Sequence, residues 1–474
     1  MKHLGLTFLC VVFCFAVSQA VAEKKIVCYL GTWAYYRWGV GKFTVDNIHT
    51  GLCTHLMYAF FGINEDGTVR IIDPYLDLEE NWGLGYVKRF NDLKKLNSEL
   101  KTMAAIGGWN EKSLKFSKVS ADPVLRKKFI DDCVKLCQTF GFDGIDLDWE
   151  YPSQQDSPSL DDKDNHAIWL EEFRVEFDRH GLLLSAAVAS AEFSSGLSYH
   201  IARVSAALDF INVMTYDLHG PWDFQTGLNS PLYEGPADVT ERQKQMNTNA
   251  SIQYWLSQGA DPKKIILGIP LYGRTFTLAR EQENHIGAPI NGPGMAGPFT
   301  REPGFIGYNE FCDMFAKENW DIHYSQEQVG FYAVKGNQWI GFDNVETIEA
   351  KVQYMHDNDL GGIMVWSLET DDYHGLCGPR YALMNTVYRL VNHGAEPPAP
   401  PPAVTTPVPP TGPTGPNVGE CDPAGIFPNP DSCQKFFVCT EDGRRFDFEC
   451  PDGLLFDPVN LYCNWKDAVH CELL

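Results

Sequence analysis

Residues 142–152 of the chain read Phe142-Asp143-Gly144-Ile145-Asp146-Leu147-Asp148-Trp149-Glu150-Tyr151-Pro152. Acidic and large apolar residues alternate in this run, and successive side chains of a β-strand point to opposite faces. A strand here would place Asp146, Asp148 and Glu150 on one face and Trp149 on the other, in the core. The alternative for an acidic run is a solvated surface, but the interleaved apolar residues favour a buried strand.

Three carboxyl groups on one buried face have a chemical consequence. Like charges this close raise one another's pKa, so at least one acid stays protonated near neutral pH. Glu150 is the last of the three along the strand and would lie nearest to its open end. We therefore take Glu150 as the candidate general acid.

Seven further short apolar runs recur along the chain, with helical patterns between them. We expect eight strands, at residues 26–30, 55–61, 101–106, 144–149, 182–188, 210–214, 264–269 and 362–366. Strands that alternate with helices predict a parallel sheet, and eight such units indicate an α/β protein with a closed (β/α)8 barrel. Active sites of such barrels lie at the C-terminal ends of the strands.

Two details of the barrel can be predicted. Residues 123–140 have helical spacing, with one side formed by Val124, Phe129, Cys133, Leu136 and Cys137. The widest interval between strands, residues 271–360, contains strand-like runs at 331–334 and 338–342. We therefore predict a small α+β insertion at about residues 271–342, between the seventh and eighth strands.

The ends of the chain differ in character from its centre. Residues 1–22 have the apolar run and the small residues of a secretory signal peptide, and the run is short for a membrane anchor. Residues 23–395 would form the barrel domain. Ten prolines between Glu396 and Pro416 indicate an extended linker at residues 396–420. Residues 421–474 hold six cysteines, which predict a small module with three disulfides whose pairing the spacing leaves open.

Composition excludes several kinds of partner. The 474 residues include 62 acidic and 38 basic ones, a formal net charge of −24. This charge argues against nucleic acids and anionic membranes as partners. No residue cluster has metal-ligand spacing and no glycine-rich loop follows a strand, so we expect no metal and no cofactor. We expect a secreted, extracellular monomer.

The acidic run resembles the Asp-x-x-Asp-x-Asp-x-Glu signature of the family 18 glycoside hydrolases, the chitinases, in full. Three further stretches are similar to that family's strand motifs: residues 101–109, 214–217 and 361–366. The resemblance covers roughly residues 24–392 and is strongest with the secreted animal chitinases, whose barrel carries an α+β insertion. It implies hydrolysis of β-1,4-linked N-acetylglucosamine polymers by an endo-acting chitinase.

The resemblance also implies a mechanism, in which the substrate supplies the nucleophile. Glu150 would protonate the leaving oxygen, and the acetamido oxygen of the −1 sugar would attack the anomeric carbon. Asp148 would orient the acetamido group and Asp146 would share a proton with Asp148. Tyr216 would hold the acetamido oxygen and Asp217 would contact the sugar. The anomeric configuration would be retained.

Several further residues match cleft positions of the family. Trp366 would form the floor beneath the −1 sugar, since aromatic faces suit the apolar faces of pyranose rings. The other matching positions are Trp33, Trp109, Trp222, Tyr29, Tyr272, Arg274, Met214 and Asp143. For any single tryptophan among them, packing in the core is the alternative.

The cysteines and one sequon complete the predictions. The resemblance implies the barrel disulfides Cys28–Cys53 and Cys312–Cys377. The tail resembles the peritrophin-A type chitin-binding module, which implies Cys421–Cys439, Cys433–Cys471 and Cys450–Cys463. Four residues apart on one helix, Cys133 and Cys137 would form a strained bridge, so buried free thiols are favoured. Asn249 begins a glycosylation sequon.

Other functions are compatible with parts of these features. A non-catalytic lectin on the same barrel would typically lack the acid at Glu150, and a chitin-matrix protein would use only the tail. An endo-N-acetylglucosaminidase acting on glycoproteins would not need the tail. The intact Glu150, Asp148 and Tyr216 favour the chitinase.

Overall fold

The computed structural model describes residues 24–398 and, in the C-terminal part, residues 425–430, 432–439, 444–450, 454–458, 462–466 and 469. The predicted signal peptide and most of the predicted linker lie outside these ranges. The chain forms two compact units, residues 1–400 and residues 401–474, and each is described by itself.

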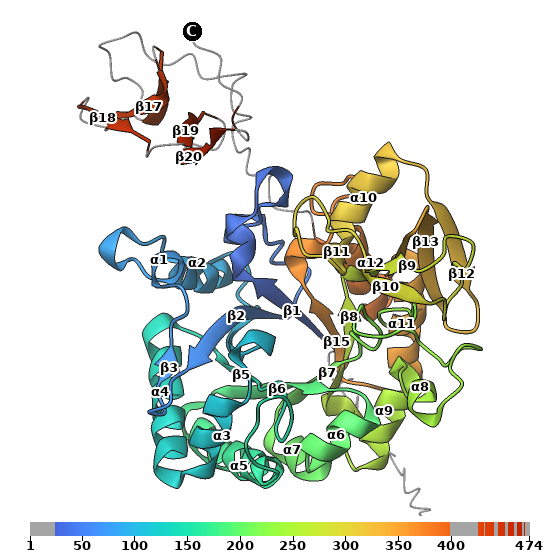
Figure 1. Cartoon of the computed structure of the whole chain (residues 1–474). Helices are drawn as coiled ribbons and strands as arrows, with labels where there is room; N and C mark the ends of the chain where they lie inside the picture. Colours follow the sequence, from blue (N-terminus) through green and yellow to red (C-terminus); the bar gives the residue numbers. More distant parts are fainter. Residues whose placement is uncertain are drawn as a thin grey trace, which may run out of the picture. The chain divides into compact units, whose positions relative to one another are not determined.

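Eight parallel strands close into a barrel in the first unit (Figure 1). Around the ring they are β1 (Lys25–Gly31), β2 (His55–Ile63), β4 (Lys101–Gly107), β5 (Gly144–Asp148), β6 (Leu183–Ala189), β7 (Phe210–Met214), β8 (Ile265–Pro270) and β15 (Gly362–Trp366). Pairing of β15 with β1 completes the ring. The predicted (β/α)8 barrel is therefore confirmed, and all eight strands lie where the apolar runs placed them.

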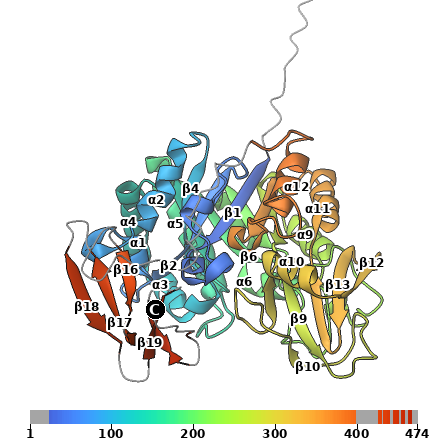
Figure 2. The same ribbon diagram turned by 90° about the horizontal axis from the view of Figure 1, so that it is seen from above.

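Helices surround the barrel on its outside (Figure 2). They are α1 (Pro74–Asp77), α2 (Tyr86–Asp92), α3 (Leu114–Ala121), α4 (Pro123–Phe140), α5 (Asp162–His180), α6 (Glu192–Ser198), α7 (Ile201–Ala207), α8 (Glu241–Lys244), α9 (Thr248–Ser257), α11 (Val345–Asp357) and α12 (Ala382–Val391). A short strand, β3 (Val69–Arg70), pairs with β2 in antiparallel fashion. Among the described residues, no helix is both long and apolar enough to cross a lipid bilayer.

The helix α4 shows how local sequence sets these boundaries. The Asp122 side chain accepts hydrogen bonds from the first free N–H groups, Pro123 begins the helix, and Gly141 ends it at φ 80°. Val124, predicted on the buried side with Phe129, is instead 73% exposed. Five residues turn a helix by about 500°, so these two side chains point well apart. Cys133 and Cys137 are buried free thiols, as favoured.

The insertion between β8 and β15 is an antiparallel sheet with one helix, as predicted. Its elements are β9 (Tyr272–Leu278), β10 (Ile290–Pro293), β11 (Phe305–Gly307), α10 (Tyr308–Lys317), β12 (Asp321–Ser325), β13 (Gly330–Lys335) and β14 (Gln338–Phe342). In both views of the molecule it lies beside the barrel (Figures 1 and 2). Because β9 follows β8 directly, the insertion begins at the C-terminal end of a barrel strand.

Short 3-10 helices follow three of the barrel strands. They are η1 (Thr32–Tyr36) after β1, η6 (Trp109–Glu111) after β4 and η8 (Leu368–Thr370) after β15. The pair Gly107-Gly108 precedes η6 at φ 125° and 84°, where a Cβ on Gly107 would lie 2.0 Å from the Asp148 carbonyl oxygen. Only glycine allows this close approach of β4 to β5.

The second unit contains two small sheets. β16 (Gly425–Asn429), β17 (Ser432–Cys439) and β18 (Arg445–Glu449) form one, and β19 (Leu454–Asp457) and β20 (Tyr462–Trp465) form the other. Cys433, Cys439 and Cys450 are disulfide-bonded. Cys421, Cys471 and the side chain of Cys463 lie outside the described residues, so the three predicted tail pairings stay predictions.

Candidate active site

The three acids of the opening run lie at the centre of the barrel. Asp146 and Asp148, on β5, are 0% and 2% exposed, and the partly exposed Glu150 follows two residues after the strand ends. Ile145, Leu147 and Trp149 pack into the apolar layer on the opposite face. The alternation of the sequence thus separates the acids from the core, and Trp149 is a core residue as predicted.

Asp146 is held by side chains from three other strands. Its Oδ2 accepts a 2.6 Å hydrogen bond from the Tyr29 hydroxyl, and its Oδ1 accepts bonds from Ser185 Oγ at 2.5 Å and Asn212 Nδ2 at 3.1 Å. Burial raises the pKa of Asp146, and these three hydrogen bonds lower it in part. The carboxyl group therefore has one fixed orientation.

Asp148 and Glu150 lie in a setting that favours their protonated forms. Asp148 Oδ1 is buried and has no hydrogen-bond partner among the described residues. Burial, followed by the charges of Glu150 and Asp146, raises the pKa of Asp148 well above its usual range. Burial and the charge of Asp217 raise the pKa of Glu150 to about 7, against hydrogen bonds from Tyr151 and Trp109. The site can therefore hold and release a proton near neutral pH.

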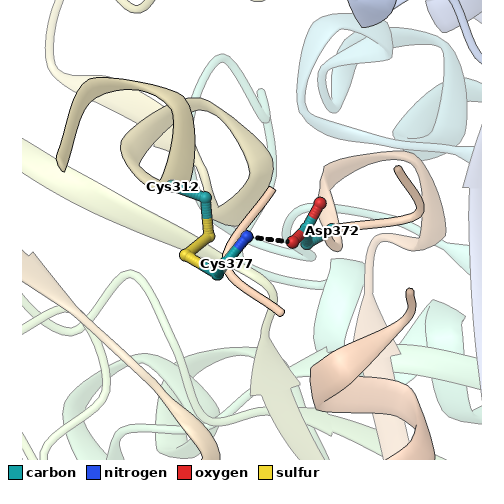
Figure 3. Close-up of side chains that lie close together, drawn as sticks. All are labelled: Cys312, Asp372 and Cys377. Carbon is teal, nitrogen blue, oxygen red and sulfur yellow. Dashed lines mark hydrogen bonds between the residues drawn. A yellow bond between two sulfur atoms is a disulfide. The ribbon is translucent and has the colours of Figure 1, made fainter. Parts of the chain in front are cut away.

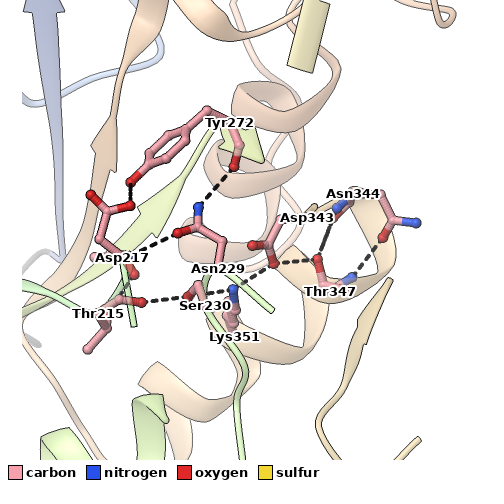
Figure 4. A network of polar contacts seen from close by, with 10 residues as sticks. Thr215, Asp217, Asn229, Ser230, Tyr272, Asp343, Asn344, Thr347 and Lys351 are labelled. Atoms are coloured by element: carbon pink, nitrogen blue, oxygen red, sulfur yellow. Dashed lines mark hydrogen bonds and ion pairs between the residues drawn. The ribbon is translucent and has the colours of Figure 1, made fainter. Parts of the chain in front are cut away.

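Two further polar residues of the site, Tyr216 and Asp217, follow the end of β7. Tyr216 is 8% exposed, and Asp217 adopts φ 54°, a left-handed conformation. Asp217 Oδ1 accepts a hydrogen bond from the Tyr272 hydroxyl at 2.6 Å (Figure 4). It accepts another from Arg274 Nε at 2.8 Å, and both donors lie on β9. The first strand of the insertion therefore fixes the Asp217 carboxylate.

Aromatic rings form a connected layer at the ends of the strands. The ring of Trp366, the last residue of β15, lies 5.5 Å from that of Tyr29 and 5.6 Å from that of Phe60. Trp33 stacks on Phe60 at 6.2 Å and is 43% exposed. Exposed rings on a connected layer are suited to stacking against sugars.

Two further tryptophans are exposed at strand ends. Trp109 is 60% exposed after β4, and Trp222 is 55% exposed in the segment after β7. The Arg274 guanidinium lies 4.9 Å from the centre of the Trp222 ring. Core packing, the alternative considered for each tryptophan, therefore does not apply to Trp33, Trp109 or Trp222.

Asp143 was predicted to bind substrate, but the structure does not place it with these residues. It precedes β5, about 16 Å along the chain from Asp148 at the spacing of a strand. Its carboxylate accepts 2.9 Å hydrogen bonds from the Thr102 amide and from Lys94 Nζ. It therefore joins neighbouring elements at the N-terminal end of the barrel.

Three other predicted cleft residues are almost completely buried. Tyr29, Tyr272 and Met214 are 1%, 2% and 8% exposed, in the apolar cluster inside the barrel. Tyr29 and Tyr272 offer no free ring face, and they reach the site through their hydroxyl groups. In the structure Tyr29 therefore supports Asp146 and Tyr272 supports Asp217, and a sugar contact of either residue or of Met214 stays a prediction.

Ser185, Asn212 and Phe60 belong to the site and were not predicted. Ser185 and Asn212 lie in the middle of buried strands, within Leu-Leu-Ser-Ala-Ala and Phe-Ile-Asn-Val-Met. A polar residue inside such an apolar run is the signal that identifies them, because a buried polar group requires a partner. Phe60 has no comparable signal.

Cys28–Cys53 and Cys312–Cys377 form disulfides, as the resemblance implied. Cys312, Cys377 and Asp372 lie close enough together to resemble a metal site (Figure 3). The two sulfur atoms are bonded to each other, so they offer no thiolate ligand. Asp372 accepts hydrogen bonds from the amides of residues 375–377 and acts as a loop anchor.

Asn249 lies on α9, half-buried, where its side-chain oxygen accepts a 3.0 Å hydrogen bond from the Tyr354 hydroxyl. The sequon serine, Ser251, is buried. Glycosylation of Asn249 stays a prediction, which mass spectrometry of the protein produced in eukaryotic cells would test.

Comparison with known proteins agrees with this geometry. The sequence model of the family 'Glycosyl hydrolases family 18' matches residues 25–371. The sequence model of the family 'Chitin binding Peritrophin-A domain' matches residues 421–471. Chitotriosidase-1 of Mus musculus is 36% identical over 462 residues, covering 94% of this chain and 96% of that protein. The similarity to Chitotriosidase-1 therefore extends over both units.

Solved structures give the same answer. The Group IV chitinase of Ostrinia furnacalis in complex with allosamidin has a TM-score of 0.77 at 44% identity, covering 79% of this chain and 100% of that one. Human YKL-39, a pseudo-chitinase with retained chitooligosaccharide binding properties, has a TM-score of 0.72 at 35% identity, covering 78% and 100%. This chain is a glycoside hydrolase: it belongs to the glycosyl hydrolases of family 18 and carries a C-terminal chitin-binding Peritrophin-A domain.

Proposed function

We propose that the protein is a secreted, endo-acting chitinase that cleaves β-1,4-linked N-acetylglucosamine polymers with retention of the anomeric configuration. The observation that carries the proposal is the column of the buried Asp146 and Asp148 and the partly exposed Glu150, in which the pKa of Glu150 is raised to about 7. A protonated carboxylic acid at this pH can protonate a leaving oxygen.

In the first step Glu150 gives its proton to the glycosidic oxygen, and the bond to the anomeric carbon breaks. The acetamido oxygen of the same sugar attacks that carbon and forms a cyclic oxazolinium ion. The proton that Asp148 shares with Asp146 moves to Asp146, so that Asp148 is ionised when it accepts a hydrogen bond from the acetamido N–H and balances the positive charge. The unpartnered Asp148 Oδ1 supports this role, because a buried polar atom requires a partner.

In the second step water attacks the anomeric carbon and gives a proton to Glu150, while the bond between that carbon and the acetamido oxygen breaks and restores the acetamido group. The carbon is inverted twice, so the product keeps its configuration. Asp146 shares a proton with Asp148, Tyr216 binds the acetamido oxygen, and Asp217 contacts the sugar. The exposed Trp33, Trp109 and Trp222 would seat neighbouring sugars along the chain, which favours an endo-acting mode.

The C-terminal unit extends this function to solid chitin. Tethering the chitin-binding domain to the barrel through the predicted linker, residues 396–420, would raise the local concentration of enzyme at the surface. Phe446 and Phe448, 45% and 48% exposed on β18, are candidate sugar platforms in this domain. A signal peptide at residues 1–22 would direct the monomeric protein out of the cell.

The test compares Glu150→Gln with Asp143→Asn, which changes a carboxylate at the opposite end of the same strand. We expect Glu150→Gln to bind chitin normally while turnover of chitotetraose falls by about 10²–10⁴-fold. Asp143→Asn should keep its turnover per folded molecule. Near-normal turnover by Glu150→Gln would refute the general-acid role, and a wild-type protein that binds without turnover would be a lectin.

A further inference from the structure

Lys351 is a fully buried lysine outside the acidic column. It lies on α11 and is 0% exposed, so its charge requires partners. Its ammonium donates to Asp343 Oδ1 at 2.6 Å and to Ser230 Oγ at 2.8 Å (Figure 4). The same Asp343 oxygen accepts a 2.7 Å hydrogen bond from the Thr347 hydroxyl. The ion pair therefore joins α11 to the residue that follows the insertion sheet.

Ser230 connects the Lys351–Asp343 ion pair to the active site through hydrogen bonds. An ammonium group can only donate, so Ser230 Oγ accepts from Lys351 and its own proton is available to another group. That proton is donated to the Thr215 carbonyl oxygen at 2.5 Å. Thr215 directly precedes Tyr216 and Asp217. Lys351 therefore gives the Ser230 hydroxyl one orientation, toward the peptide bond that leads into Tyr216.

The neighbouring Asn229 holds the other end of the same turn. Its Oδ1 accepts a 2.9 Å hydrogen bond from the Asp217 amide, and its Nδ2 donates to the Tyr272 carbonyl oxygen at 3.1 Å. Residues 229–230 thus bind both ends of the three-residue turn 215–217.

This turn needs such support. The backbone of Asp217 has a φ angle of 54°, in the left-handed region. Residues other than glycine rarely keep this backbone conformation without surrounding restraints. On the barrel side, a Cβ at Gly268 would lie 2.5 Å from the Val213 carbonyl oxygen and 3.0 Å from Tyr216 Cε1. The turn is therefore held between the backbone of β8 and the segment 229–230.

We propose that Lys351, acting through Ser230, is a positioning residue that fixes Tyr216 and Asp217 in their working geometry. The inference rests on the proposed function, because Tyr216 and Asp217 act there on the −1 sugar. It assigns the buried ion pair a part in turnover besides its part in stability.

The test uses Ser230→Ala and Lys351→Met, with Thr347→Val as the matched control. Thr347 donates to the same Asp343 carboxylate and caps α11, but it does not reach the turn. We expect Ser230→Ala and Lys351→Met to lower kcat on chitotetraose by about tenfold, because small misplacements of positioned groups are costly. KM should rise by about twofold, because the same misplaced groups also contact the bound sugar. Thr347→Val should lower the melting temperature and leave kcat unchanged.

A double-mutant cycle with Tyr216→Phe separates positioning from general damage. If Ser230 acts through Tyr216, then Ser230→Ala lowers kcat far less in the Tyr216→Phe background than in the wild type. A full, multiplicative loss in that background, or wild-type kcat in folded Ser230→Ala, would overturn the inference. If Lys351→Met does not fold, Ser230→Ala decides the question.

If the protein is not a chitinase, the experiments give a result that differs from failure of the positioning role. A wild-type protein that binds chitotetraose without turnover would refute the chitinase and leave the positioning role measurable by calorimetry. Positioning then predicts weaker binding for Ser230→Ala than for Thr347→Val, and equal affinities would contradict it.

Discussion

The Tyr29 hydroxyl donates a 2.6 Å hydrogen bond to Asp146 Oδ2, joining β1 to β5 across the interior of the barrel. These two strands are not neighbours in the sheet. Tyr29 also accepts a 3.0 Å hydrogen bond from Asn212 Nδ2. The innermost acid of the site is thus bound to the barrel by a network of polar side chains.

Tyr29→Phe should therefore destabilise the protein. A hydrogen bond to a charged group contributes about 1.5–3 kcal/mol, and its loss leaves Asp146 and Asn212 each without one partner. Urea unfolding would measure the change. Tyr36→Phe is the control, because the Tyr36 hydroxyl donates to Asp73 at 2.7 Å in an exposed setting. Equal losses of stability for the two variants would contradict the account.

The pH dependence of hydrolysis should follow the protonation of the Glu150 carboxyl group. Its pKa is raised to about 7, and only the protonated acid can protonate the leaving oxygen. We expect kcat/KM on soluble chitin oligomers to be sustained below that pH and to fall as the pH rises through it.

Asp217→Asn should move that fall in activity to lower pH. The Asp217 charge raises the pKa of Glu150, so its removal lowers that pKa. The measurement is the pH at which kcat/KM falls. The absolute rate is not used, because it also changes when Asp217 no longer contacts the sugar. A profile that stays in place, or moves to higher pH, would contradict the proposed coupling.

Removal of residues 397–474 should affect hydrolysis of solid chitin and of soluble chitotetraose differently. The barrel domain would keep its turnover of chitotetraose, because the acids and tryptophans of the site all lie in the first unit. Hydrolysis of solid chitin should fall, since tethering is lost. Product release from both substrates, measured at equal enzyme concentration, checks this. Unchanged activity on solid chitin would refute the tethering role.

The acidic run of the sequence predicts the site well because strand alternation is a local rule. Asp146, Asp148 and Glu150 needed only the period of two, and the barrel placed that face inward. Asp143 lies outside this group, because a motif does not distinguish a substrate contact from a residue that joins strands. The burial of Tyr29 could not be predicted, because it involves contacts with residues far along the chain, such as Trp366, 337 positions away.

Lys351 could not have been identified from the sequence. A lysine on an amphipathic helix ordinarily lies in solvent. Its partners, Ser230 and Asp343, come from separate parts of the chain and meet only in the folded protein. Ser185 and Asn212 are an intermediate case, since polar residues inside apolar strands are visible once the strands are assigned.

The anomeric form of the first product tests the central claim most directly. Chitotetraose would be cleaved inside an NMR tube, and the newly formed reducing ends observed before they equilibrate in water. Substrate-assisted catalysis by Glu150 and Asp148 predicts that the β-anomer appears first and that fully deacetylated oligomers are not cleaved. Early appearance of the α-anomer, or cleavage of the deacetylated oligomers, would contradict it.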